Sequence, residues 1–177
     1  MEQFRFNVAH LLTLPVGAAR NFEIQGERLL IDGMASTAGP VQGTVRLLRT
    51  KVGILARVEL KAAVPYQCSR CAEDFIASAT ASFEEEFIPT IDVVTGCPVG
   101  EVAEDEALRI DANHVLDLSE LARQYIALAL PMQPLCRPDC AGLCERCGHN
   151  LNRGPCQCGP QEPDSPWQAL KTVLERS

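Results

Sequence analysis

The first half of the chain alternates between apolar and polar side chains over long stretches. Residues 54–66 carry an apolar side chain at every even position, and charged or small side chains fill most odd positions. Residues 75–87 largely repeat this pattern, and residues 41–50 predict a third strand upstream. A period of two is typical of half-buried β-strands. The three segments therefore predict an antiparallel β-meander with one face in solvent.

A helical period replaces the alternation after residue 116. Asp117 is a predicted N-cap, because its carboxylate can accept a backbone N–H bond, and Glu120 completes a capping box. Pro131 ends the helical pattern. The apolar face of this helix is predicted to consist of Leu118, Leu121, Tyr125 and Leu128. We expect the helix to cover one face of the sheet, which gives an α+β fold.

The composition changes after Pro131. Residues 132–160 hold six of the nine cysteines and four prolines, with too few apolar side chains to fold by burial alone. We therefore divide the chain into an α+β body over residues 1–131 and a cysteine-rich zinc-binding segment over residues 132–177. Ser165 and Pro166 are typical of a helix start, so a short C-terminal helix is expected to dock on the body.

Eight of the nine cysteines form four close pairs. The pairs are Cys68/Cys71, Cys136/Cys140, Cys144/Cys147 and Cys156/Cys158. Each pair can present two sulfur atoms from one tight turn to a tetrahedral zinc ion. The short connection between the last two pairs predicts that they share one ion, which leaves the first two pairs to bind a second ion. Cys97 is left over as an unpaired thiol.

A single zinc ion is the competing interpretation. Four of the six C-terminal cysteines would then bind it, and Cys68 and Cys71 would form a free or redox-active pair. Zinc is favoured over an iron–sulfur cluster because the chain lacks a close group of three cysteines of the ferredoxin type. A site closed by four cysteines keeps no open position for a substrate, so we expect a structural metal and a protein that is not an enzyme.

The charge is unevenly distributed along the chain. The 177 residues carry a net charge of −7, and residues 84–120 contain eleven acidic side chains and one basic side chain. An acidic chain does not favour binding driven by the RNA backbone. Ordinary strand-surface charge, partly matched by Glu59, is the slightly favoured interpretation of the basic residues near the first cysteine pair. Local contact with RNA would instead use them as a cationic face. Its residues are Arg46, Arg49, Lys51, Arg57, Lys61 and Arg70.

The expected compartment is the cytoplasm. No apolar run reaches membrane-spanning length, and the first five residues lack the basic start and apolar core of a secretory signal. Thiols in such a compartment stay reduced, which favours metal binding over disulfides.

Two parts of the sequence together resemble a known family. One is Leu130–Asn152, which holds four cysteines and is followed by the pair Cys156/Cys158. The other is Cys68–Phe75, which lies ahead of the acidic segment Phe83–Phe87. From about residue 6 to residue 174, the chain is similar to the YceD family, also called the large ribosomal RNA subunit accumulation proteins.

The resemblance implies a ribosome-biogenesis factor that supports accumulation or processing of large-subunit ribosomal RNA. No enzymatic activity is established for the family as such. The implied partners are that RNA or its precursor, together with ribosomal proteins. Cys68 and Cys71 match the central motif of the family, and the six C-terminal cysteines match its cysteine-rich branch.

Two other functions remain open on the sequence. One is a thiol redox or metal-sensing protein, whose cysteines alternate between metal-bound and disulfide states. The other is an acidic adaptor, which would use residues 84–120 to bind a basic ribosomal protein. Glu84, Glu85 and Glu86 continue the strand alternation without a histidine beside them, so they predict a solvated edge rather than an active site.

Overall fold

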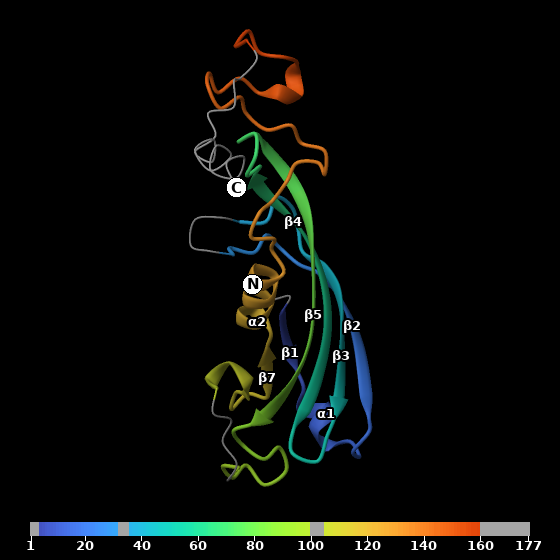
Figure 1. Cartoon of the computed structure of the whole chain (residues 1–177). Coiled ribbons are helices and arrows are strands. Elements are labelled where there is room, and N and C mark those ends of the chain that lie inside the picture. The colour runs from blue at the N-terminus through green and yellow to red at the C-terminus, as the bar shows by residue number, and fades with distance from the viewer. Residues whose placement is uncertain (1–3, 32–35, 100–104, 160–177) are drawn as a thin grey trace, which may run out of the picture. The chain divides into compact units, whose positions relative to one another are not determined.

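The computed structural model describes residues 4–31, 36–99 and 105–159 (Figure 1). The chain divides into two compact units. The larger comprises Met1–Ser69 and Glu73–Cys136, and the smaller comprises Arg70–Ala72 and Arg137–Ser177. The body boundary expected after residue 131 stays a prediction. The expected C-terminal helix lies outside the described residues.

The larger unit is built on a five-stranded sheet with the strand order β2-β3-β4-β5-β6. The strands are β2 (Ala19–Gln25), β3 (Gln42–Arg49), β4 (Ile54–Gln67), β5 (Asp74–Pro89) and β6 (Arg109–Ile110). Neighbouring strands are antiparallel except β5 and β6, which are parallel. The predicted meander is confirmed as β3, β4 and β5, and Figure 1 shows β4 and β5 as one long hairpin.

The register of the sheet explains why alternating side chains bury one face. Val58 of β4 lies opposite Val45 of β3 and Phe83 of β5, and all three are buried. Arg57 and Glu59, the neighbours of Val58 along β4, are exposed. Because successive side chains of a strand point to opposite faces, the sheet has an inner apolar face and an open polar face.

Short elements cover the inner face. β1 (Arg5–Asn7) pairs with β7 (Val115–Asp117), α1 (Ala9–Thr13) follows β1, and α2 (Ser119–Leu128) packs against β4 and β5. Figure 1 shows α2 and the β1–β7 pair on the same side of the sheet. The core beneath them includes Phe4, Leu11, Leu47, Leu60, Phe87, Leu116, Leu118 and Ile126. The α+β fold with a covering helix is confirmed.

The helices of the described residues are short. Two are single 3₁₀ turns, η2 (Glu106–Leu108) and η3 (Leu151–Arg153). Within the described ranges, no helix combines the length and the apolar character needed to cross a bilayer.

Helix α2 begins later than the capping pattern predicts. Pairing with Arg5 holds Asp117 extended as the last residue of β7, and Leu118 takes the N-cap position without a side-chain hydrogen bond. The Asp117 carboxylate still accepts a bond from the Ser119 N–H at 2.8 Å, which satisfies one free donor of the first turn. Glu120 instead accepts bonds from side chains one turn further on. The predicted capping box is therefore wrong.

The buried face of α2 also differs from the predicted face at its end. Leu121, Ala122 and Ile126 are buried, whereas Leu128 is 78% exposed. At about 100° per residue, Leu128 lies roughly 80° away from Leu118 around the helix, at the margin of the apolar stripe. The prediction is therefore wrong for Leu128.

The three glutamates at 84–86 divide between the two faces of the sheet. Glu85 is half-buried on the inner side, where the Tyr125 hydroxyl donates to its carboxylate at 2.6 Å. The Tyr125 ring stacks on Phe83 with a centroid separation of 4.3 Å. Glu84 and Glu86 are exposed. The solvated edge predicted for all three is therefore wrong for Glu85.

Tyr125→Phe should remove this hydrogen bond and keep the ring stacking. The Glu85 carboxylate then loses its donor, so we expect the free energy of unfolding at pH 7 to fall by about 1–2 kcal/mol. The bond also raises the pKa of Tyr125 above its usual 10.0. Its contribution is thus present below about pH 10 and disappears as the pH rises through the raised value. Urea unfolding of both proteins measures the difference, and equal stability at pH 7 would contradict it.

Candidate metal centres and the open sheet face

The turn between β4 and β5 carries the first cysteine pair. The Cys68 N–H donates to the Glu73 carbonyl oxygen at 2.9 Å, which closes the turn. Cys68 and Cys71 are both buried. Ala72 follows them with a φ of 55°, a left-handed conformation that is uncommon for residues with a side chain.

The pair Cys144 and Cys147 lies in a turn with the same backbone design. The Cys144 N–H donates to the His149 carbonyl oxygen at 2.8 Å, again five residues further along the chain. Gly148 has a φ of 69°, in the place that Ala72 takes in the first turn. The shared design supports a shared task for the two turns, namely presenting two sulfur atoms to one ion.

Ala72→Gly should stabilise the first turn, and Gly148→Ala should destabilise the second. Left-handed backbone costs an alanine about 1 kcal/mol relative to glycine, so we expect shifts of up to that size with opposite signs. A Cβ added at Gly148 would meet no atom within 4 Å, so this loss reports backbone conformation alone. Urea unfolding of the two variants tests the shared design. If both substitutions changed the free energy of unfolding in the same direction, the shared design would be contradicted.

One group of four thiols consists of Cys68, Cys71, Cys136 and Cys140. Their Sγ atoms all lie within 4.8 Å of one another, and three of the four residues are buried. The Cys136 N–H donates to the Cys68 Sγ at 3.4 Å, and the Asn152 amide donates to the Cys140 Sγ at 3.3 Å. Such donors stabilise the thiolate form that a metal ion requires.

Asn152 is a supporting residue that cysteine spacing did not reveal. Its side-chain oxygen accepts bonds from the Ala141 N–H at 2.8 Å and the Arg137 guanidinium at 2.6 Å. Its amide nitrogen donates to the Asn150 side chain at 2.8 Å as well as to the Cys140 sulfur. These bonds fix the amide beside the sulfur. An asparagine within a cysteine-rich loop is too common a feature to have identified this role.

The second group of four thiols consists of Cys144, Cys147, Cys156 and Cys158, whose Sγ atoms also lie within 4.8 Å of one another. Backbone N–H bonds from Cys147 and Arg146 lower the pKa of Cys144 to about 6. A hydrogen bond with the Cys147 sulfur, helped by desolvation, raises the pKa of Cys158 to about 12. The sulfur atoms of the cluster therefore lie so close together that deprotonation of one thiol disfavours deprotonation of another. A bound cation removes this repulsion, because it takes the place of the protons.

Both groups have the donor set and spacing of a metal site. Zinc–sulfur bonds of about 2.3 Å in a tetrahedron place sulfur atoms about 3.8 Å apart, inside the 4.8 Å that encloses each group. Each group could therefore hold one metal ion with no coordination position left for a substrate. The groups are those expected from the spacing of the pairs, and the metal-binding role of the eight cysteines stays a prediction.

Cys97 belongs to neither group. It is exposed in the larger unit, where its thiol donates to the Thr95 carbonyl oxygen at 3.8 Å. This thiol is the natural control for experiments on the other eight.

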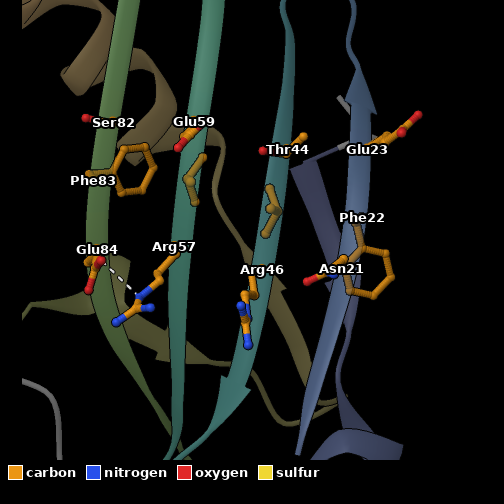
Figure 2. Close-up of a pocket in the computed structure, with 12 residues that line it drawn as sticks. Asn21, Phe22, Glu23, Thr44, Arg46, Arg57, Glu59, Ser82, Phe83 and Glu84 are labelled. Atoms are coloured by element: carbon orange, nitrogen blue, oxygen red, sulfur yellow. Dashed lines mark ion pairs between the residues drawn. The ribbon is translucent and has the colours of Figure 1, made fainter.

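Three of the six cations predicted to contact RNA share the open face of the sheet. They are Arg46, Arg57 and Lys61, all exposed. Figure 2 shows Arg46 and Arg57 side by side on β3 and β4, where they are register partners. Glu84 forms an ion pair with Arg57 at 2.9 Å, whereas Arg46 forms none within the part of the chain that the structure describes.

The other three cations lie elsewhere. Arg49 is the register partner of the buried Ile54, and its guanidinium donates to two carbonyl oxygens of the β3–β4 turn at 2.8 and 2.9 Å. Lys51 is exposed within that turn. Arg70 donates to the Cys140 carbonyl oxygen at 3.1 Å in the smaller unit. The structure therefore does not bring the six residues together as one cationic face.

The open face is hollowed around Arg46 and Arg57. The hollow has a volume of about 910 Å³, and its lining also includes the carboxylates of Glu23 and Glu59 (Figure 2). The outward positions of the described strands β2–β5 carry no aromatic side chain. Phe22 and Phe83 also line the hollow, but they belong to the inward series of β2 and β5, where their rings contact Phe6 and Tyr125. This face therefore offers phosphate-binding and polar groups but no outward ring on which a nucleic-acid base could stack.

These features define an α+β protein with two groups of four thiols. A family model described as Large ribosomal RNA subunit accumulation protein YceD matches residues 56–174, a range that includes all eight grouped cysteines. The chain belongs to this family.

Relatives in two kinds of organism are consistent with this membership. The chain is 27% identical over 158 residues to the chloroplastic large ribosomal RNA subunit accumulation protein YCED homolog 1 of Arabidopsis thaliana, covering 77% of this chain and 49% of the relative. It is 26% identical over 130 residues to an uncharacterized protein of Mycobacterium tuberculosis (strain H37Rv), covering 73% and 60%. The matches thus span about half to three fifths of these relatives. No solved structure matches the chain significantly.

Proposed function

We propose that this protein supports the accumulation of large-subunit ribosomal RNA as an assembly factor and not as an enzyme. The family match over residues 56–174 carries the proposal, because the family and its Arabidopsis relative are named for that role. The thiol groups support a role without catalysis, since a site closed by four cysteines keeps no open position on a metal. The cytoplasmic location stays a prediction.

Depletion of the protein in its own cells tests the proposal. The ratio of large-subunit to small-subunit ribosomal RNA should fall, and expression of the intact chain should restore it. The protein should also sediment with large-subunit precursors and crosslink to their RNA. An unchanged ratio, together with absence from those particles, would contradict the proposal.

We further propose that each thiol group holds one structural zinc ion. Four thiolates select zinc or iron–sulfur chemistry, and pairs of cysteines in tight turns are typical of zinc. The described residues of the smaller unit bury only Cys71, Cys140 and Gly142, so apolar burial contributes little to its stability. A structural zinc contributes on the order of 10 kcal/mol. Elemental analysis should find about two zinc ions per chain, and iron or no metal would contradict the assignment.

For contact with RNA, we propose the open face around Arg46. An unpaired guanidinium in a hollow suits a phosphate group, and the absence of outward rings favours contact with the backbone rather than with bases. The carboxylates of Glu23 and Glu59 limit the number of phosphates that this face accepts. Binding here is therefore expected to be weak, insensitive to base sequence and sensitive to salt.

Arg46→Ala should weaken RNA binding and lower its dependence on salt. Loss of one phosphate contact to single-stranded RNA is expected to reduce the slope of log affinity against log salt concentration by about 0.7. Lys51→Ala is the matched control, because it removes the same charge from a position off the open face. Titration of ribosomal RNA fragments at several salt concentrations measures both slopes, and equal slopes would remove Arg46 from the interface.

The acidic-adaptor alternative has fewer carboxylates available on β5 than the sequence indicates, because two of the three glutamates at 84–86 are bonded within the protein. Glu84 is paired with Arg57, and Glu85 bonds to Tyr125. Glu86 is exposed on the open face. Reversal of its charge with Glu86→Lys tests the alternative while leaving those bonds intact. Unchanged binding of a basic ribosomal protein would count against that use of the strand.

A further inference from the structure

The two thiol groups differ in their access to solvent. In the first group, Cys68, Cys71 and Cys140 are 2%, 3% and 3% exposed. In the second group, Cys147 is exposed and the other three residues are half-buried. Cys136, the fourth residue of the first group, is half-buried. A small oxidant in solution therefore has more direct access to the sulfur atoms of the second group, whereas burial protects three of the four residues of the first.

The second group also brings together two sulfur atoms from different turns. The Sγ atoms of Cys144 and Cys156 lie 3.4 Å apart. A disulfide bond is about 2.05 Å long, so a movement of about 1.4 Å joins them. The described residues around them bury no apolar side chain that would resist this movement, since residues 143–159 are all exposed or half-buried.

We propose that Cys144 and Cys156 are a site of reversible oxidation, at which a peroxide forms a disulfide and the second group releases its metal ion. This inference depends on the proposed function in one respect, namely that the metal ion of the second group is zinc. Loss of two thiolate ligands leaves the ion with two protein ligands, too few to hold it.

The reaction balances with peroxide as the only oxidant. One thiolate attacks a peroxide oxygen, the O–O bond breaks, and a sulfenic acid forms as hydroxide leaves. The second thiolate then attacks that sulfur, the S–S bond forms, and a second hydroxide leaves. Two electrons pass from the sulfur atoms to the peroxide, and two protons from solvent convert the hydroxides to water. A dithiol reductant reverses the change by thiol–disulfide exchange.

The consequence is a local loss of order. Backbone bonds such as Leu151 N–H to the Gly142 carbonyl oxygen, at 2.9 Å, are exposed to competition from water once the ion has left. Arg146 and Arg153 are both exposed in this segment. They offer trypsin two cleavage sites whose susceptibility reports whether the second group is closed.

The test uses the full zinc-loaded chain carrying Cys97→Ser, which removes the exposed thiol outside both groups. Hydrogen peroxide should release about one of the two zinc ions, as measured with a chromophoric chelator. Peptide mapping with fragmentation should then find a disulfide between Cys144 and Cys156. Cleavage after Arg146 and Arg153 should become faster. A dithiol with added zinc should restore the metal content and the resistance to trypsin.

A second variant and the pattern of release keep the inference falsifiable. Cys156→Ser in the same background should begin with about one zinc ion and release none at the same peroxide dose. Release of both ions at one rate, or a disulfide confined to other cysteines, would overturn the proposal. A wild-type chain isolated without metal would instead refute the zinc assignment, and the disulfide map would still decide this proposal.

Discussion

Cys68→Ser should remove about one zinc ion from the protein and unfold the part that depends on it. Serine is close in size to cysteine but is a poor zinc ligand, so three thiols remain where a tetrahedral ion needs four. A structural zinc site contributes on the order of 10 kcal/mol, which is comparable to the whole stability of a typical domain. Elemental analysis measures the metal content, and urea unfolding followed by circular dichroism measures the stability.

Cys97→Ser is the matched control for this substitution. It makes the same chemical change in an exposed residue that belongs to neither thiol group. We expect its zinc content to be unchanged and its free energy of unfolding to shift by no more than about 0.5 kcal/mol. If Cys68→Ser behaved like this control, the first group would not be a metal site.

The strands could be predicted from the sequence where the alternation is long. β4 and β5 span 14 and 16 residues, so burial of one face leaves a pattern that chance does not produce. β2 was missed because Phe22 and Ile24 are the only large apolar residues on its inner side. Arg20 shares that side, where its guanidinium lies 2.9 Å from the His10 Nδ1. A polar residue on the inner side interrupts the alternation of apolar and polar side chains on which the prediction of a strand depends.

The β1–β7 pair, which covers part of the inner face, could not be predicted from the sequence, and the reason differs from that for β2. β1 and β7 have three residues each, too few to show any period. Their pairing joins Arg5 to Asp117, and nothing local in the sequence indicates so distant a partner. That pairing also holds Asp117 in a strand, which explains why a good capping residue does not begin α2.

The thiol groups were more predictable than the cationic face. Cysteines separated by only one to three residues must lie close together in space, so their spacing limits which pairs can meet. Arginines carry no such restriction, and their direction depends on details of each strand end. Arg49 does not belong to the outward-facing residues of β3, because it is the register partner of the buried Ile54. Its guanidinium instead donates to the Gly53 carbonyl oxygen of the β3–β4 turn. Three-dimensional register, and not composition, decides which cations reach the open face.

Gly43→Ala should destabilise the sheet by about 3 kcal/mol or more, at the upper end of the cost of overpacking. Gly43 of β3 faces Leu60 of β4 across the sheet. An added Cβ would overlap the Glu59 carbonyl oxygen and lie 2.8 Å from the Leu60 Cδ2. The first obstacle is backbone, so no change of side-chain rotamer relieves it, and the two strands must separate locally.

Gly39→Ala is the matched control, because a Cβ at that position meets no atom within 4 Å. We expect its denaturation midpoint to stay close to that of the unchanged protein, whereas Gly43→Ala should unfold at much lower urea concentration with the same zinc content. Gly43→Ala should lose stability but keep its metal, whereas Cys68→Ser should lose both, so the metal content distinguishes the two effects. Equal midpoints for the two glycine variants would mean that Gly43 does not face Leu60. The register that places Arg46 beside Arg57 on the open face would then fail with it, since both pairs belong to the same β3–β4 ladder.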